Sequence, residues 1–234
     1  LNSALYNPQL YLTQMGAPTD HILLDDIALL PNPSQYKLVI FLNCWNMTDS
    51  QRTLVKSLEN NNRVVLFCYG QGYFNGSSSS AANIQDVTGM VMYVNSSDTK
   101  ASTRVYIKNG THALSTAIYA KGVTTMGPTT SLGKTIYVND STATILGGNS
   151  SSGTNKYMAI KDMGTWKSIY CTTAEIPSYA LREIARYAGV NIYNENNDTF
   201  YANKSYVNIH PNHAEATSQS RTINFPVPVN VYDA

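Results

Sequence analysis

The sequence predicts an α/β fold built on a doubly wound, largely parallel sheet, because two apolar runs flank a well-marked helix start. Residues 37–42 and 63–69 are almost continuously apolar and do not alternate, which is typical of strands buried on both faces. Between them, Thr48 and Gln51 have the spacing of a capping box. A strand, a helix and a strand in this order form a right-handed parallel crossover unit.

The rest of the chain adds helices and a β-rich middle. Residues 3–14 and 178–188 have helical patterns that end before Gly16 and Gly189. Residues 75–80 and 149–155 are Ser/Gly/Asn loops. Short strands are predicted at residues 90–94, 103–107, 134–138, 143–146, 156–160 and 166–171. We therefore expect one domain over residues 1–234, with an antiparallel β insertion at about 90–148.

Composition excludes several classes of partner. Charged residues make up only 13% of the chain and the net charge is +1, with no basic stripe, so a nucleic-acid partner is not expected. No apolar run approaches the length of a membrane span, so we expect no membrane partner. The chain begins at Leu1, which indicates a fragment of a longer protein. Abundant Asn, Ser and Thr favour an extracytoplasmic or secreted location. Eight N-x-S/T triplets are candidate glycosylation sites if the source is eukaryotic: Asn46, Asn75, Asn95, Asn109, Asn139, Asn149, Asn197 and Asn203.

A thiol nucleophile is one hypothesis for catalysis. Cys68 ends an apolar strand and is followed by Tyr69-Gly70, a position where hydrolases and amidotransferases place a nucleophile on a sharp turn. His210 lies near the C-terminus, as a general base would. Asn212 occupies the place of the carboxylate that orients such a base, and no helix start follows Gly70. The alternative is that Cys68 is a buried structural cysteine.

No cofactor or metal is expected. The segment Gly70-Gln71-Gly72 lacks the third glycine and the following helix of a nucleotide loop. Three scattered cysteines and four scattered histidines give no metal-ligand spacing; they are Cys44, Cys68, Cys171, His21, His112, His210 and His213. The adjacent carboxylates Asp25 and Asp26 would point to opposite faces of a strand, so we expect them at a turn instead.

Several segments in order resemble one family, the glutamine-amidotransferase-like domain of trimeric bacterial β-galactosidases and related glycoside hydrolases. The segments that carry the likeness cover most of the chain outside its middle. They are residues 16–26, 36–43, 48–52, 62–73, 88–90, 181–190 and 201–210. The ordered set carries the likeness, because no single motif is diagnostic.

The resemblance implies a flavodoxin-like sheet and a non-catalytic accessory or oligomerisation domain that follows a catalytic barrel in the same chain. In that family the paired catalytic glutamates lie in the barrel, so no catalytic residue is carried over to this sequence. The barrel and further copies of the chain are the expected partners. Two alternatives stay open, a thiol hydrolase or amidotransferase using Cys68 and His210, and a carbohydrate-binding module using exposed Tyr rings with Trp45 or Trp166.

Overall fold

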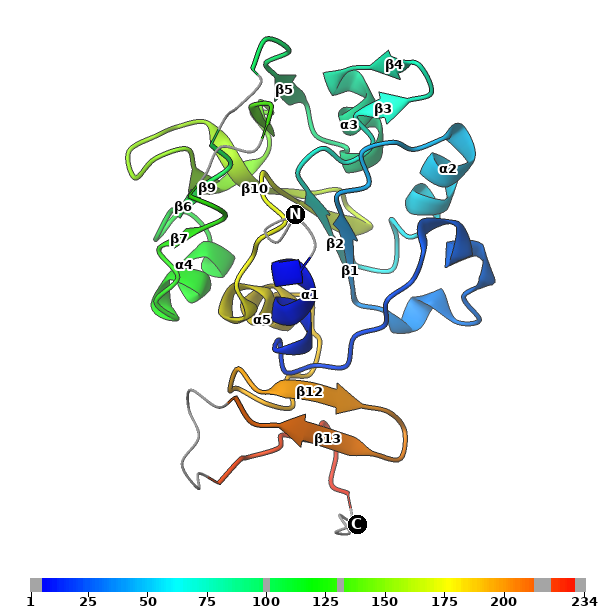
Figure 1. Cartoon of the computed structure of the whole chain (residues 1–234), viewed down its shortest axis with the longest axis vertical. Coiled ribbons are helices and arrows are strands. Elements are labelled where there is room, and N and C mark those ends of the chain that lie inside the picture. The colour runs from blue at the N-terminus through cyan, green and yellow to red at the C-terminus, as the bar shows by residue number, and fades with distance from the viewer. Residues whose placement is uncertain (1–5, 99–101, 130–132, 213–219, 230–234) are drawn as a thin grey trace.

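The computed structural model describes residues 6–98, 102–129, 133–212 and 220–229. It shows a mixed α/β architecture in which a curled central sheet carries helices on both faces (Figure 1). The helices are α1 (Asn7–Thr13), η2 (Leu24–Leu29), η3 (Pro33–Gln35), α2 (Asp49–Ser57), α3 (Ala81–Thr88), α4 (Ala113–Ala120) and α5 (Ser178–Tyr187). None of these helices has the length and apolar character needed to cross a membrane.

The main sheet runs in the order β1-β2-β11-β10-β9-β6-β7, and β8 joins it to β5. Its strands are β1 (Leu38–Leu42), β2 (Arg63–Cys68), β5 (Met92–Val94), β6 (Val105–Ile107), β7 (Thr125–Met126), β8 (Ile136–Val138), β9 (Thr144–Gly148), β10 (Lys156–Asp162) and β11 (Trp166–Cys171). Two small hairpins lie outside it, β3 (Phe74–Asn75) with β4 (Ser78–Ser79), and β12 (Thr199–Ala202) with β13 (Val207–His210). The parallel pairs are β1 with β2 and β2 with β11, whereas the other described pairs are antiparallel.

The predicted crossover unit is present as β1–α2–β2. The backbone N–H of Gln51 donates to Thr48 Oγ1 (3.3 Å) and the Thr48 N–H donates to Gln51 Oε1 (2.9 Å), which completes the capping box. α5 also ends as expected, with Gly189 at φ +78°. β1 differs from the prediction because it is an edge strand, so most of its apolar side chains are only half-buried.

The middle of the chain is less purely β than its sequence indicates. Antiparallel pairs occur between β6, β7 and β9, although β7 was not predicted. α4 lies among these strands, and β9 also pairs with β10 in the main sheet. α4 begins where His112 Nδ1 accepts a hydrogen bond from the Leu114 N–H (3.1 Å). Histidine is not one of the residues usually found at an N-cap, so the sequence did not predict this helix start. The loop expected at residues 75–80 contains the β3–β4 hairpin instead.

β2 separates two hydrophobic cores because its side chains alternate between the two faces of the sheet. Val64, Leu66 and Cys68 join the core beneath α1, α4 and α5. Val65 and Phe67 join the opposite core with α2 and α3. All six residues of β2 are buried, which agrees with its continuous apolar sequence.

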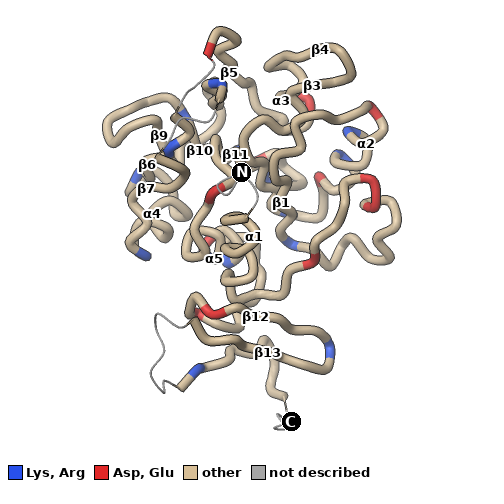
Figure 2. The backbone as a smooth tube through the Cα atoms, viewed as in Figure 1, with Lys and Arg blue, Asp and Glu red and all other residues tan. Residues whose placement is uncertain are grey.

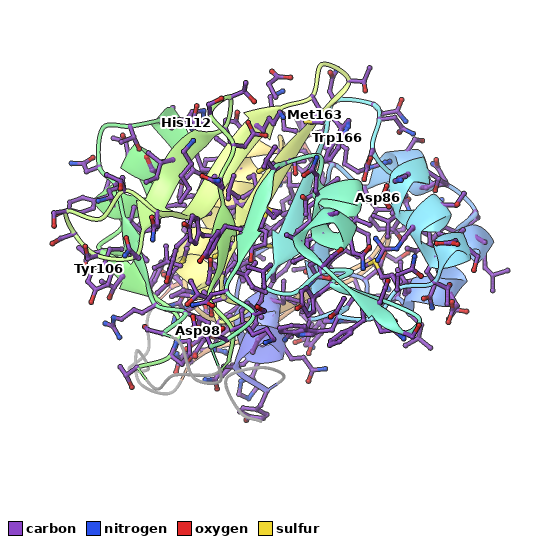
Figure 3. All side chains as sticks on the ribbon, turned by 90° about the horizontal axis from the view of Figure 1, so that it is seen from above. Asp86, Asp98, Tyr106, His112, Met163 and Trp166 are labelled. Carbon is purple, nitrogen blue, oxygen red and sulfur yellow. The ribbon has the colours of Figure 1, made fainter. Side chains whose placement is uncertain are left out.

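Trp166 belongs to the second core and is not available on the surface. Its side chain is only 6% exposed, and its ring meets Phe67 edge-on at 6.4 Å. It lies beside Met163 at the β10–β11 turn (Figure 3). The contact requires glycine at position 89, because a Cβ there would lie 2.5 Å from Met163 Cε. The expectation that Trp166 offers an exposed ring for sugar binding is therefore wrong.

Charges are sparse and scattered over the fold (Figure 2), yet three arginines are almost completely buried. Arg182 of α5 is 1% exposed. Its guanidinium donates to the carbonyls of Gln14 and Met15 after α1 and to those of Glu195 and Asn196. One side chain therefore holds α1, α5 and the segment before β12 together.

Replacing Arg182 by Met should lower the free energy of unfolding by about 2–4 kcal/mol, because several buried carbonyls lose their donors. Urea unfolding followed by circular dichroism measures this. Arg186→Met is the matched control. It removes an arginine whose side chain is 45% exposed, so it should cost less than about 1 kcal/mol. Equal losses in the two variants would show that the carbonyl contacts of Arg182 are not what stabilises the fold.

Glu59, just after α2, has a carboxyl group with a raised pKa. Burial raises the pKa of its carboxyl from 4.5 to about 7, while Lys56 lowers that pKa and Asp86 raises it to smaller extents. One of its oxygens is buried and accepts no hydrogen bond from the described residues. The folded state therefore binds a proton more tightly here than the unfolded state does.

This difference predicts a pH dependence with a definite sign. Between about pH 4.5 and pH 7 the folded state holds more protons, so Glu59 should lower stability as pH rises. We expect a loss of about 1 kcal/mol, since the carboxyl is partly exposed. Glu59→Gln should remove this part of the slope in chemical unfolding at several pH values, whereas Glu195→Gln should keep it. A wild-type slope in Glu59→Gln would contradict the assignment.

Candidate functional site

The carboxyl ends of β1, β2 and β11 meet at one edge of the sheet because the three strands are parallel. Open α/β sheets bind ligands at this edge, and the candidate nucleophile Cys68 ends β2 there. The turns after these strands therefore decide what chemistry the chain can support.

The turn after β2 is sharp, and the residue in the strained position is Tyr69. Its φ is +63°, in the left-handed region that non-glycine residues rarely adopt. Its N–H donates to the carbonyl of Cys171 at the end of β11 (2.7 Å). Cys68 is still part of β2. The predicted sharp turn is therefore present, but Cys68 lies before its strained residue.

The Tyr69 side chain is buried and fills the turn after β2. Its hydroxyl donates to the Lys134 carbonyl (2.9 Å), its ring meets Trp45 edge-on at 4.9 Å, and the residue is only 7% exposed. Burial raises the pKa of Tyr69 to about 12, with a further contribution from Tyr157. A neutral, hydrogen-bonded phenol in this environment is a poor nucleophile at neutral pH.

The backbone around the turn leaves no room for a reacting group. The fully buried Gln71 amide donates to the carbonyls of Phe41 (2.9 Å) and Cys68, and its oxygen accepts from the Cys44 N–H (3.0 Å). A Cβ on Gly70 would lie 2.4 Å from the Trp45 ring, so that ring rests directly on the peptide. The edge that hydrolases keep open is packed with protein here.

The thiols at this edge are buried. Cys68 and Cys171 are register partners on β2 and β11, and neither is exposed. Burial raises the pKa of the Cys68 thiol well above its ordinary value of 9, with Cys171 and Cys44 adding to the effect. Burial also raises the pKa of Cys171 to about 12. Cys44 is half-buried, and burial raises its pKa as well.

His210 is not brought to the thiols. It is the last residue of β13, is exposed, and pairs with Thr199 in the hairpin outside the main sheet (Figure 1). The Asn212 N–H donates to Asp198 Oδ1 (3.0 Å). Among the described residues, nothing links the imidazole to Cys68.

The remaining candidates from the sequence are the Asp25-Asp26 pair and the possible metal ligands. Asp25 and Asp26 lie in the first turn of η2, where Asp25 Oδ1 accepts from Gln51 Nε2 (2.8 Å). The described part of the chain contains no group of three or more His, Cys, Asp or Glu that could hold a metal ion. His213 lies outside the described residues.

An aromatic cluster lies beside the turn, and of its members only Trp45 was named as a candidate from the sequence. Trp45 lies 6.0 Å from Tyr73 and 6.4 Å from Phe74, and Tyr73 meets Phe74 edge-on at 4.9 Å. Phe74 is 39% exposed and Trp45 is half-buried, so only the outer rim of the cluster reaches solvent. Trp45 soon after one strand and Tyr73-Phe74 soon after the next were the available signals.

The fold is similar to a segment of several β-galactosidases. The β-galactosidase from Bacillus circulans sp. alkalophilus aligns over 91% of this chain and 30% of its own length, with a TM-score of 0.59 and 11% identity. A catalytic mutant of a GH42 β-galactosidase from G. stearothermophilus aligns over 85% of this chain and 28% of its own, with a TM-score of 0.58 and 10% identity. The β-galactosidase from Halorubrum lacusprofundi aligns over 86% of this chain and 28% of its own, with a TM-score of 0.58 and 13% identity.

The chain therefore spans less than a third of the length of these enzymes. At such low identity the likeness shows a shared fold. No family model matches the sequence, and no curated protein matches it.

The buried thiols should resist modification. We expect Cys68 and Cys171 to react with Ellman's reagent only after unfolding in guanidinium chloride, because an inaccessible thiol with a raised pKa forms little thiolate. Cys44→Ser, which removes the half-buried thiol, should leave a folded protein with almost no reactivity. Rapid native labelling of Cys68 in that variant would revive the thiol-enzyme hypothesis.

Proposed function

We propose that the chain is a non-catalytic accessory domain of a larger glycoside hydrolase of the β-galactosidase type, and that its role is contact between subunits. The observation that carries this proposal is the closed turn after β2, where Tyr69 fills the position that a nucleophile would need. The partial coverage of the similar β-galactosidases supports it, because the chain corresponds to one segment of a longer enzyme.

The proposal includes several finer assignments. The β1–α2–β2 unit and the helices on both faces support a flavodoxin-like, amidotransferase-like domain. The catalytic barrel belongs to another part of the same polypeptide, and the enzyme acts outside the cytoplasm. Fold alone does not give activity, so the sugar specificity of the whole protein rests on experiment.

The surface before β1 is suited to subunit contact. Leu23 and Leu29 are 74% and 76% exposed, on the segment that also carries η2. Exposed leucines of this kind favour association with another protein surface. We propose this segment as the site where copies of the chain meet.

The proposal predicts an oligomer without glycosidase activity. Light scattering after size-exclusion chromatography should give a multiple of the chain mass, and nitrophenyl galactoside should not be hydrolysed. The double variant Leu23→Ser, Leu29→Ser should raise the dissociation constant of the oligomer roughly tenfold or more, which shifts the population to monomers. Val227→Ser, which changes another exposed apolar residue, should not do so. A monomer at all concentrations would refute subunit contact, and hydrolysis would refute the non-catalytic role.

Carbohydrate binding is a second candidate function, favoured by the aromatic cluster beside β1 and β2. Phe74 presents a partly exposed ring, and the neighbouring Asn75 amide donates to Asp49 (2.9 Å), so apolar and polar groups adjoin as sugar binding requires. Retention on an immobilised galactan that is lost in Phe74→Ala and kept in Tyr206→Ala would support this function over the first.

A further inference from the structure

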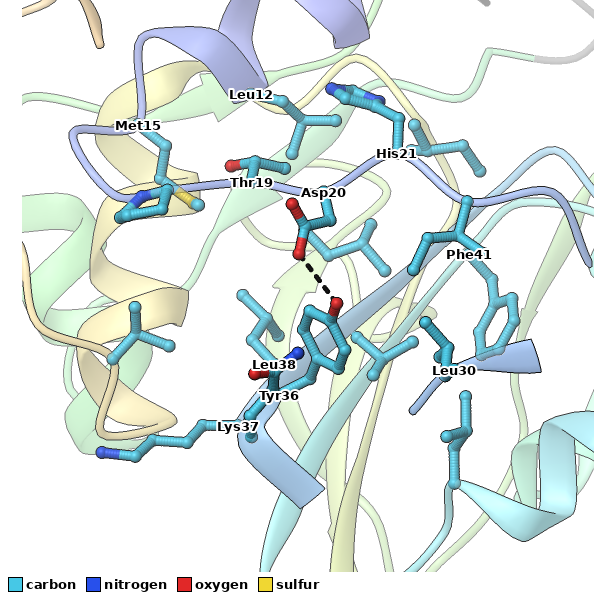
Figure 4. Close-up of a pocket in the computed structure, with 18 of the residues that line it drawn as sticks. Leu12, Met15, Thr19, Asp20, His21, Leu30, Tyr36, Lys37, Leu38 and Phe41 are labelled. Carbon is cyan, nitrogen blue, oxygen red and sulfur yellow. Dashed lines mark hydrogen bonds between the residues drawn. The ribbon is translucent and has the colours of Figure 1, made fainter. Parts of the chain in front are cut away.

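Two cavities on the described surface differ in chemistry. A groove of about 700 Å³ along β1 is lined mainly by apolar side chains, with a hydrogen bond from the Tyr36 hydroxyl to Asp20 Oδ2 (2.7 Å) inside it (Figure 4). A second cavity, of about 230 Å³, has polar side chains around Ile160, and we call it the polar cavity. Its residue Lys167 pairs with Val64 near the start of β2. The polar cavity therefore lies at the opposite edge of the sheet from the turn after β2.

The polar cavity is assembled by segments that are distant in sequence. Asp162 is the last residue of β10, and Lys167 is the second residue of β11. His112 is the N-cap of α4, Tyr187 is the last residue of α5, and Thr144 is the first residue of β9. Figure 3 shows His112 on the same side of the molecule as the labelled residues of the β10–β11 turn. Only the tertiary fold brings these polar side chains together.

A carboxylate and an ammonium group line the cavity without pairing. Asp162 and Lys167 are direct partners in the antiparallel β10–β11 register, so their side chains lie on the same face of the sheet, with Cβ atoms about 5 Å apart. Asp162 Oδ1 accepts from the Gly164 N–H (2.8 Å). The other carboxylate oxygen and the Lys167 ammonium have no hydrogen bond or ion pair with the described residues. Both groups are therefore available to a ligand with complementary charges.

His112 supplies a donor whose proton has a fixed position. Its Nδ1 accepts from the Leu114 N–H (3.1 Å), so this nitrogen carries no proton while the cap of α4 is intact. Burial lowers the pKa of the imidazole, which keeps the ring neutral at pH 7. A neutral ring without a proton on Nδ1 carries it on Nε2. No described residue accepts from Nε2, so the cavity has a second donor in addition to Lys167.

The rest of the lining positions these groups and adds a small apolar surface. The Tyr187 ring meets the His112 ring edge-on at 5.6 Å, which limits how the imidazole can turn. Burial raises the pKa of Tyr187, and the charge of Asp162 raises it further, so the phenol near that carboxylate stays protonated at pH 7. Ile160 is only 5% exposed and is the aliphatic part of the lining.

We infer that the polar cavity binds a free α-amino acid. The carboxylate of the ligand accepts hydrogen bonds from Lys167 and from His112 Nε2, and its ammonium group donates to Asp162. Charge-assisted hydrogen bonds of this kind are the stronger ones in proteins. The volume of the cavity is below the range of about 300–1,000 Å³ for drug-sized ligands, which suits a ligand as small as an amino acid.

The charges of the cavity favour a zwitterion over other small ligands. One anionic and one cationic side chain line it, so a zwitterion leaves neither without a partner. A simple anion pairs with Lys167 but leaves Asp162 unmatched, and a simple cation does the reverse. A neutral sugar matches neither charge. The inference does not depend on the proposed function.

Ligand-observed NMR on the full chain tests the inference. The protein amino acids are screened one at a time, and at least one should bind. For the tightest of them, blocking the amine as the N-acetyl derivative or the carboxylate as the amide should each raise the dissociation constant roughly tenfold or more. Galactose and acetate are the matched probes for a sugar and a simple anion. Binding of no amino acid, or binding of either probe as tightly as the best amino acid, would overturn the inference.

Two variants assign each charge of the ligand to its partner. Lys167→Met should remove the preference for the free carboxylate over the amide, and keep the preference for the free amine over the N-acetyl derivative. Asp162→Asn should do the reverse. Lys204→Met, which removes an exposed lysine between β12 and β13, should change neither preference. Matching far-UV circular dichroism shows that the variants are folded. Unaltered preferences in the cavity variants, or loss of both preferences in each, would contradict the proposed site.

Discussion

Buried guanidinium groups hold together the parts of this fold that the sheet does not reach. Arg52, Arg63 and Arg182 are 5%, 2% and 1% exposed. Their partners are mainly backbone carbonyls. Arg63 donates to Tyr36, Leu58 and Pro33, and Arg52 donates to Gly72, Phe74 and Asn83. A buried charge is costly unless its donors are satisfied, and the fork of an arginine can satisfy several loop carbonyls at once.

The position of these three side chains explains why a chain with few charges can keep long loops in place. Arg63 anchors the segment before β1 to the end of α2, and Arg52 anchors the β3 turn to α3. Arg182 does the same for the end of α1. The segment before β1 and the chain that follows the closed turn after β2 are both held by such contacts. The candidate sites therefore depend on buried polar geometry as much as on the hydrophobic cores.

The sequence was most informative where local chemistry and burial agree. β2 was predictable because all of its side chains are buried. α2 was predictable because Thr48 and Gln51 have the spacing of a capping box. α3 and α4 were missed because each has eight residues and lies among Ser, Gly and Asn. The sharp turn after Cys68 was predicted, but the positive φ of Tyr69 was not, because a residue pattern does not give the sign of φ. A tyrosine at φ +63° is held there by packing against Trp45 and Gly133, which tertiary structure alone brings together.

The turn after β2 is closed, whereas the outer edge of β1 is open. At the carboxyl ends of the strands, Tyr69, Gln71 and Trp45 fill the space that a substrate would need. The two edge strands of the main sheet, β7 and β1, differ in length and composition. β7 has two residues, and short edge strands pair poorly with other chains, whereas β1 offers five apolar residues with no charge or proline among them. An apolar edge strand of that kind is a template for pairing with another strand, so the outer edge of β1 is the part of the sheet most open to contact with a partner.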